Sequence, residues 1–212
     1  MPKLGMEPIR RKQIRRAAAR VIAKKGFRLT TVREIAAKAK VSTGTLSYYY
    51  SDKSDLLLDA FFAISEWFQA RVKRTIETAK TPRDAVKGLV EASFENSNST
   101  VSDGQAMWLW ATSEALMWPK MAELINQRRK AFQEILIDLK RELDADDVLT
   151  DSDIASLAAE YDAFLNGISA HVVTGGESLD TASIERSLIL LVDARVACAQ
   201  SAKAQNITVT KG

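Results

Sequence analysis

A cluster of small polar and aromatic side chains near the N-terminus could make close contact with another polar molecule. It extends from Ser42 to Tyr49 and contains Ser, Thr, Gly, Thr, Leu, Ser, Tyr and Tyr in that order. Hydroxyl groups donate and accept hydrogen bonds, and a glycine lets the backbone approach a ligand closely. Tyrosine hydroxyls can donate to phosphate oxygens, while their rings can lie against a sugar or a thymine methyl group. These residue types suit contact with nucleic acid, provided that one helix presents them together.

Two short helices are predicted to position this cluster. Thr31 is the N-cap of the first helix, Glu34 completes a capping box, and the helix ends near Ala39. Ser42 caps the second helix. A connection of about three residues is typical of a helix-turn-helix rather than of an antiparallel hairpin. In such a unit the second helix lies in the major groove of DNA with its N-terminal residues at the base edges.

The predicted DNA contacts are of two kinds. Thr43, Gly44 and Ser47 are the main candidates for the base edges, and Thr31 and Lys53 for phosphates, because helix N-termini and lysines hold the backbone without reading sequence. The full predicted set is Thr31, Arg33, Ser42, Thr43, Gly44, Thr45, Ser47, Tyr48, Tyr49 and Lys53.

Three consecutive tyrosines, Tyr48 to Tyr50, allow two interpretations. In one, Tyr48 and Tyr49 face DNA while Leu46 and Tyr50 enter the core. In the other, the helix buries two rings for packing and exposes one. The three tyrosines alone favour neither interpretation, but the residues around them favour the first.

Charge is divided unevenly along the chain. Residues 1–53 hold 14 Lys and Arg against three acidic residues, a net charge of +11, while the remainder carries −8. A basic module on an acidic body concentrates a protein on a polyanion, because each cation near a phosphate releases condensed counterions. Nucleic acid and an anionic membrane are both candidates on charge alone, and a merely solvated basic face is the third interpretation.

Helical periodicity covers nearly the whole sequence, which predicts an all-α protein of about nine helices. The expected domains are a helix-turn-helix DNA-binding domain over 1–53, a helical ligand-binding and dimerisation domain over 54–204, and a disordered tail over 205–212. The first helix should stop at Gly26, with an apolar stripe along one face. The other helices are expected at 54–78, 82–96, 102–118, 119–143, 152–174 and 181–204, with breaks at 98–100, 144–151 and 175–176.

The segment 26–57 resembles the tetracycline-repressor (TetR) family of one-component regulators. Matching residues are Gly26, Phe27, Thr30, Thr31, Ile35, Ala36, Val41, Ser42, Gly44, Leu46, Tyr48, Tyr50, Lys53 and Leu56. The resemblance implies a helical C-terminal domain, a homodimer and repression from a palindromic operator. One departure is Lys40, where the family has glycine in the turn. The lysine must either adopt a left-handed conformation or reshape the turn, at a cost of about 1 kcal/mol.

The acidic part of the chain contains a second group of candidate residues. They combine aromatic rings, which attract a quaternary ammonium ion by cation–π interaction, with carboxylates that neutralise its charge. A packing role is the alternative, because aromatic residues at helical spacing are usually core residues. The set predicted to bind a ligand is Trp67, Trp108, Trp110, Glu114, Trp118, Tyr161 and Asp162.

Two stretches are similar to the choline-responsive, BetI-type repressors of the glycine-betaine pathway. One covers Met1–Met6 with Pro8–Arg11 and Gln13, and the other covers Trp108–Leu109 with Glu114–Ala115 and Pro119. The resemblance implies choline or a related quaternary ammonium compound as effector. A regulator of efflux or catabolic genes that senses a different hydrophobic or aromatic ligand is the alternative.

The helices expected over 152–174 and 181–204 are apolar over more of their surface than one small core requires. Two such helices from each subunit would form a four-helix interface in a homodimer with two-fold symmetry, matching a palindromic operator. His171, on the first of them, is interpreted as a packing residue and Cys198 as a small buried one.

Other classes of protein have little support. One His, one Cys and no phosphate-cradling, zinc-protease or nucleophile-elbow motif argue against an enzyme, and no cofactor or metal is expected. The first helix has an Ala-rich stripe without large inserting side chains, which argues against membrane-surface binding. No stretch approaches the roughly 20 apolar residues of a membrane span. A cytoplasmic location is expected, since residues 1–6 lead into charge rather than an apolar signal core.

Overall fold

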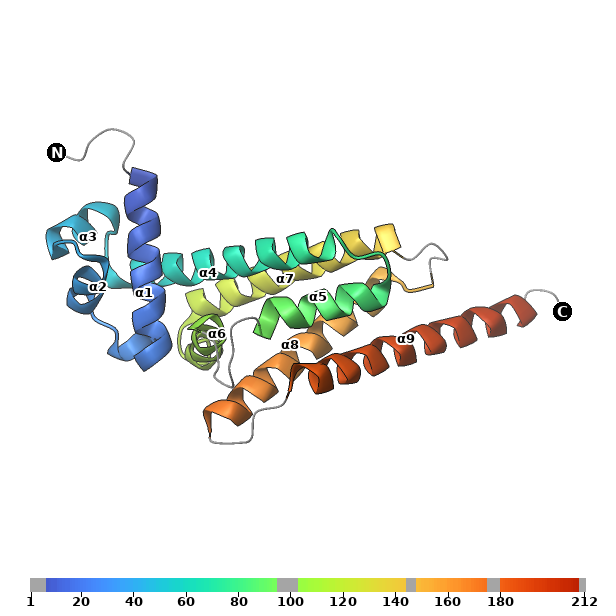
Figure 1. Cartoon of the computed structure of the whole chain (residues 1–212). Helices are drawn as coiled ribbons and strands as arrows, with labels where there is room; N and C mark the ends of the chain where they lie inside the picture. Colours follow the sequence, from blue (N-terminus) through green and yellow to red (C-terminus); the bar gives the residue numbers. More distant parts are fainter. Residues whose placement is uncertain (1–6, 95–102, 144–147, 175–179, 210–212) are drawn as a thin grey trace. The chain divides into compact units, whose positions relative to one another are not determined.

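The computed structural model describes residues 7–94, 103–143, 148–174 and 180–209, and these form nine helices (Figure 1). In chain order they are α1 (Glu7–Leu29), α2 (Val32–Ala39), α3 (Thr43–Tyr49), α4 (Lys53–Ile76), α5 (Pro82–Phe94), α6 (Asp103–Glu114), α7 (Pro119–Leu143), α8 (Asp151–Val173) and α9 (Thr181–Val209). The expected all-α class is confirmed over these residues.

Several helix ends differ from the expected ones. Gly26 has φ 77° and ψ 172°, so regular helix stops there as predicted, but one more turn follows and α1 ends at Leu29. The helix α6 ends at Glu114 rather than Trp118, and α9 continues to Val209, past the expected end at residue 204. Local periodicity does not fix such ends, because tertiary packing extends or shortens a terminal turn.

Some expectations fall outside the described residues. These are the Met1–Met6 segment, the breaks at 98–100 and 175–176, part of the break at 144–151, and residues 210–212 of the predicted tail.

The helices form two compact units. The first contains α1, α2, α3, α4 as far as Phe68, α6, and α7 as far as Arg129. The second contains the remainder of α4 and α7 together with α5, α8 and α9. The functional division at residue 53 stays a prediction; by packing alone, α6 belongs with the N-terminal helices.

The core of the first unit follows the predicted apolar stripe. On α1, Ile14, Ala18 and Ile22 are fully buried, at i, i+4 and i+8 on one face. This face packs mainly against α2 and α6, and α2 and α3 lie beside α1 (Figure 1). Burying three such side chains is the main source of stability for a helix that is otherwise rich in charge.

The second unit is held by a buried tyrosine. The Tyr161 hydroxyl donates to the carbonyl oxygen of Leu89 (3.1 Å) and hydrogen-bonds the Ser93 hydroxyl, and its ring stacks on Phe132 with centroids 5.7 Å apart. Burial raises the Tyr161 pKa, so the phenol remains neutral. Tyr161 therefore joins α8 to α5 and α7.

The expected packing roles of His171 and Cys198 are wrong for the single chain, because both residues are exposed. Two large apolar side chains on α8 and α9 are exposed as well, Val173 at 62% and Leu190 at 67%. Apolar periodicity shows that a face is covered without telling whether the same chain covers it.

No helix among the described residues is both long and apolar enough to cross a membrane.

Candidate functional site

Both α2 and α3 begin with the predicted N-caps. The Thr31 hydroxyl accepts from the backbone N–H of Glu34 (3.2 Å), and the Glu34 carboxylate accepts from the backbone N–H of Thr31 (3.1 Å), which completes the capping box. A hydrogen bond from Lys25, followed by those from Thr31, lowers the pKa of Glu34 from 4.5 to about 2. Ser42 caps α3 by accepting from the backbone N–H of Thr45 (3.0 Å).

Lys40 adopts the left-handed conformation expected where the family has glycine. Its φ and ψ are 53° and 47°, and its backbone N–H donates to the carbonyl oxygen of Ala37 (3.1 Å). The adjacent carbonyl of Ala39 accepts a hydrogen bond from the Gln13 side chain on α1 (2.6 Å). The turn thus keeps its geometry despite the lysine, and α1 fixes the end of α2.

The predicted base-reading residues lie on the exposed face of α3. Thr43, Gly44 and Ser47 are all exposed. Space is open above Gly44, since an added Cβ would come no closer than 3.7 Å to the Ser42 hydroxyl. The Thr43 hydroxyl makes no hydrogen bond to any residue that the structure describes, whereas Ser47 donates to the Thr43 carbonyl (3.3 Å). The face is therefore polar and accessible.

The predicted residues around α3 are engaged to different degrees. Thr45 is half-buried, and its hydroxyl lies 2.9 Å from that of Ser42. Lys53 donates to the carbonyl oxygen of Arg28 (3.0 Å), which caps the end of α1. Arg33 is exposed and makes no hydrogen bond or ion pair with any described residue. Arg33 therefore keeps all its donors for a partner.

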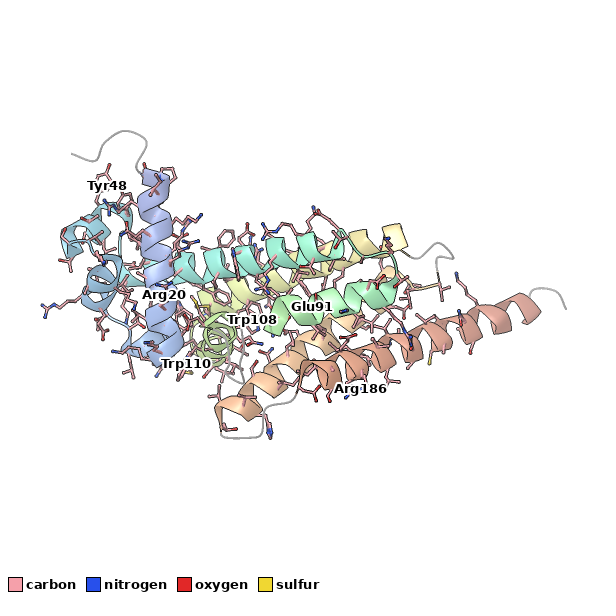
Figure 2. The ribbon with its side chains drawn as sticks, viewed as in Figure 1. Arg20, Tyr48, Glu91, Trp108, Trp110 and Arg186 are labelled. Carbon is pink, nitrogen blue, oxygen red and sulfur yellow. The ribbon has the colours of Figure 1, made fainter. Side chains whose placement is uncertain are left out.

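Of the three tyrosines, only Tyr48, labelled in Figure 2, is exposed, at 67%. Tyr49 and Tyr50 are buried, each with 8% of its surface exposed. The expectation that the Tyr49 ring would lie open beside that of Tyr48 is wrong. The two rings meet edge to face (5.1 Å), and the Arg11 guanidinium lies 5.5 Å from the Tyr49 ring centre. The alternative with two buried rings and one exposed ring describes α3.

A polar network joins α1, α3 and α4 behind this face. Arg15 makes two hydrogen bonds to the Asp59 carboxylate (2.7 and 2.8 Å), and the Tyr50 hydroxyl donates to the same carboxylate (2.7 Å). Burial, together with the hydrogen bond to Asp59, raises the pKa of Tyr50 to about 12. Because the phenol stays protonated, it remains a donor, and the C-terminal end of α3 is fixed to α4.

The predicted effector residues are divided between the two units, and those of the first unit differ in their surroundings. Trp110, Glu114 and Trp118 meet the C-terminal end of α1. The Trp110 ring covers Gly26, where an added Cβ would lie 3.0 Å from its Cε3 atom, and the Trp118 ring meets the Phe27 ring edge to face (6.2 Å). The Glu114 carboxylate pairs with Arg28 (3.4 Å).

Trp108 packs against the same core as Trp118. Labelled in Figure 2 with Trp110, it stacks at a tilt on Phe61 (ring centroids 5.3 Å apart), which meets Phe27 edge to face (6.4 Å). The buried indole N–H of Trp108 has no partner among the described residues. Trp67 is 52% exposed. Asp162 and Tyr161 both belong to the second unit. The Asp162 carboxylate accepts a hydrogen bond from the Asn166 side chain (3.2 Å). Trp108 is the one aromatic candidate that keeps a buried donor for a ligand.

Sequence reasoning missed the residues that connect these elements. Asp59 lies 44 positions from Arg15, and Glu114 lies 86 positions from Arg28, so no local spacing relates them. Among the described residues, no group of three or more His, Cys, Asp and Glu side chains could hold a metal ion.

Comparison with known proteins decides the family. Residues 14–60 match the tetR family of bacterial regulatory proteins, and residues 82–196 match the C-terminal domain of BetI-type transcriptional repressors. The chain is a BetI-type member of the tetR family. It is therefore a helix-turn-helix transcriptional repressor, and α2 and α3 form its DNA-binding motif.

Individual relatives agree with this assignment. The HTH-type transcriptional regulator BetI of Rhizobium meliloti is 32% identical over 148 residues, which cover 69% of this chain and 72% of the relative. BetI of Paraburkholderia xenovorans is 29% identical over 191 residues, which cover 88% of this chain and 93% of the relative. A putative transcriptional regulator from Saccharomonospora viridis, solved in complex with choline, has the same fold, with a TM-score of 0.70 at 23% identity and coverage of 86% and 95%.

Proposed function

We propose that this BetI-type repressor binds a palindromic operator as a homodimer in the cytoplasm and releases it when choline or a related quaternary ammonium compound binds. The observation that carries the operator proposal is the exposed polar face of α3, which is held on a packed scaffold. Thr43, Gly44 and Ser47 are the proposed base-edge contacts.

Phosphate contacts are proposed for side chains around this face. Arg33 and Tyr48 are exposed and keep donors for phosphate oxygens, and Thr31 lies at the N-terminus of α2, where backbone N–H groups favour an anion. Lys53 has donors beyond the one that caps Arg28. Ser42 and Thr45 hydrogen-bond each other at the start of α3, so they are proposed mainly to shape the end of that helix.

The dimer is proposed to form through α8 and α9. Exposed Val173 and Leu190 support it, since large apolar side chains on adjacent helices gain from burial against a partner. Two-fold symmetry would place two copies of α3 about 34 Å apart, the separation of successive major grooves.

Choline is the proposed effector. Two observations support it: the similarity to BetI relatives, and the choline-bound neighbour of the same fold. On this chain, Trp108 beside Phe61 supplies aromatic faces for a quaternary ammonium group and an indole N–H for an oxygen. Trp67, Tyr161 and Asp162 remain candidates.

The signal is proposed to reach the DNA-binding helices through α6. Trp110 covers Gly26, and Glu114 pairs with Arg28, so a shift of α6 changes the packing at the end of α1. A tenfold loss of operator affinity needs a coupling free energy of about 1.4 kcal/mol between the two binding sites. Because coupling is reciprocal, a bound operator must weaken choline binding by the same factor.

The effector proposal is tested with choline and its uncharged analogue, in which carbon replaces nitrogen. Choline should bind, as measured by calorimetry, and lower operator affinity, while the analogue should bind far more weakly. Trp108→Leu should weaken choline binding. Trp110→Leu removes the α6 ring that covers Gly26, so it should leave choline binding unchanged but reduce the effect of choline on operator affinity. Equal binding of the analogue would favour the alternative, a sensor of hydrophobic ligands. Binding of neither compound would refute the choline assignment and leave operator binding standing.

A further inference from the structure

The helix α1 carries nine Lys and Arg residues, and the structure divides them into two groups. Five have polar partners within the first unit: Arg10 bonds Gln13, Arg11 bonds Glu7, Arg15 bonds Asp59, Lys25 bonds Glu34 and Arg28 bonds Glu114. The other four are exposed and make no hydrogen bond or ion pair with any residue that the structure describes. These four are Lys12, Arg16, Arg20 and Lys24, called here the α1 stripe.

The α1 stripe occupies one face of the helix. Its members follow one another at i, i+4 spacing, so they lie above one another opposite the buried face of Ile14, Ala18 and Ile22. Arg20, in the middle of the stripe, is labelled on α1 in Figure 2. At 1.5 Å per residue the stripe is about 18 Å long. Like charges at this spacing repel and destabilise a helix, and no carboxylate among the described residues offsets them.

We propose that the α1 stripe binds the phosphate backbone of the DNA that flanks the operator, outside the grooves that α3 enters. This inference rests on the proposed operator binding. A length of about 18 Å matches about five phosphates of one strand, which are spaced about 3.4 Å apart along the helix axis. Arg16 and Arg20 present fixed forks of donors that suit phosphate oxygens. The stripe therefore adds affinity and salt dependence without reading sequence.

Chemistry favours DNA over a membrane surface as the partner. A helix that lies on a membrane buries large apolar side chains below its cations. The residues between the stripe positions include Ala19, which is buried, and Ala23, which is half-buried, and neither can reach into a lipid layer. From Lys12 to Lys24 the exposed side chains are the four cations of the stripe. Ile9, which is 59% exposed, lies one turn before Lys12 on the same face, and one such side chain is less than the apolar face that a membrane-surface helix buries.

The test compares two duplexes over a range of salt concentrations. One is the shortest promoter fragment that retains specific binding, and the other is the same fragment with about 15 base pairs added on each side. With four contacts from each subunit of the dimer, eight in all, the plot of log K against log salt should be steeper by about 7 on the long duplex. Replacing Lys12, Arg16, Arg20 and Lys24 by Gln should abolish this difference and leave binding to the short duplex unchanged. Arg16→Lys with Arg20→Lys should retain it, since charge is kept.

A matched control removes four exposed cations elsewhere, from Lys73, Arg74, Lys87 and Lys120. It should keep the flank dependence; an equal loss would show an effect of net charge and overturn the proposal. A wild-type protein indifferent to flank length, or a stripe variant that keeps the dependence, would also overturn it. If the stripe variant loses the binding to vesicles of anionic lipid that wild type shows, while its flank dependence is unchanged, the stripe binds a membrane instead of DNA. If wild-type protein shows no specific binding to any promoter fragment, the operator proposal itself fails.

Discussion

Replacing Gly26 by alanine tests whether the end of α1 depends on contact with α6. At φ 77° and ψ 172° the residue occupies a region that is almost restricted to glycine, and placing another residue there costs about 1–3 kcal/mol. The new Cβ would also lie 3.0–3.3 Å from three carbons of the Trp110 ring, and overpacking of this kind costs about 1–3 kcal/mol. Gly26→Ala should therefore lower the free energy of unfolding by about 2–6 kcal/mol in total.

The assay is urea unfolding followed by circular dichroism, at one fixed protein concentration because dimerisation shifts apparent stability. Gly167→Ala is the matched control: nothing lies within 4 Å of its added Cβ in the middle of α8, so it should stabilise the protein by up to about 1 kcal/mol. In the double variant Gly26→Ala/Trp110→Ala the clash disappears while the backbone strain remains. The change in unfolding free energy of the double variant should therefore be smaller than the sum of the two single changes by about 1–3 kcal/mol. A Gly26→Ala variant within about 0.5 kcal/mol of wild type would refute the described contact.

Four further predictions concern the DNA-binding motif. The pKa of Glu34 is lowered from 4.5 to about 2, so the stability that its carboxylate contributes is full above pH 4.5 and is lost as the pH falls toward about 2. The free energy of unfolding should therefore change less between about pH 6 and about pH 3 in Glu34→Gln than in wild type. An equal change would contradict the hydrogen bonds of Glu34 with Lys25 and Thr31. Lys40→Gly should stabilise the protein by up to about 1 kcal/mol in urea unfolding, because it relieves a left-handed lysine, and destabilisation would show that the side chain packs. In competition assays against a panel of operator variants, Thr43→Ala should change the preference at one base pair, whereas Tyr48→Phe should weaken binding to all sequences alike; equal DNA affinity in both variants and wild type would contradict the placement of α3 in the groove. Asp59→Asn should destabilise the first unit by about 1–3 kcal/mol in thermal unfolding, since it leaves a partly buried guanidinium without its charge partner, and a neutral effect would contradict the network.

Local sequence predicted the parts of the motif that are governed by local physics. The capping box of Thr31 and Glu34 and the cap of α3 by Ser42 depend on neighbours within a few positions, and the structure has both. Of the two conformations left open for the turn at Lys40, the structure has the left-handed one. A cap or a turn residue leaves a signature in sequence because its partners are three or four residues away.

Contacts between distant segments were beyond this kind of reasoning. Trp110 on α6 and Trp118, beyond the end of that helix, were predicted to bind a ligand; their contacts with Gly26 and Phe27 on α1 were not predicted. Apolar and aromatic periodicity identifies a buried face without naming what it is buried against. The same limit left Tyr49 assigned to DNA, although Arg11 and Tyr48 enclose its ring.

Operator recognition and the response to choline can be measured together by titrating the protein onto its own promoter region at fixed salt, with competitor DNA of unrelated sequence, in the absence and presence of choline. The protein should prefer one palindromic site by at least about a thousandfold, and its affinity for that site should fall by about tenfold or more when choline saturates it. Equal binding to promoter and competitor DNA would contradict operator recognition by α3. Unchanged promoter affinity with saturating choline would contradict the effector assignment.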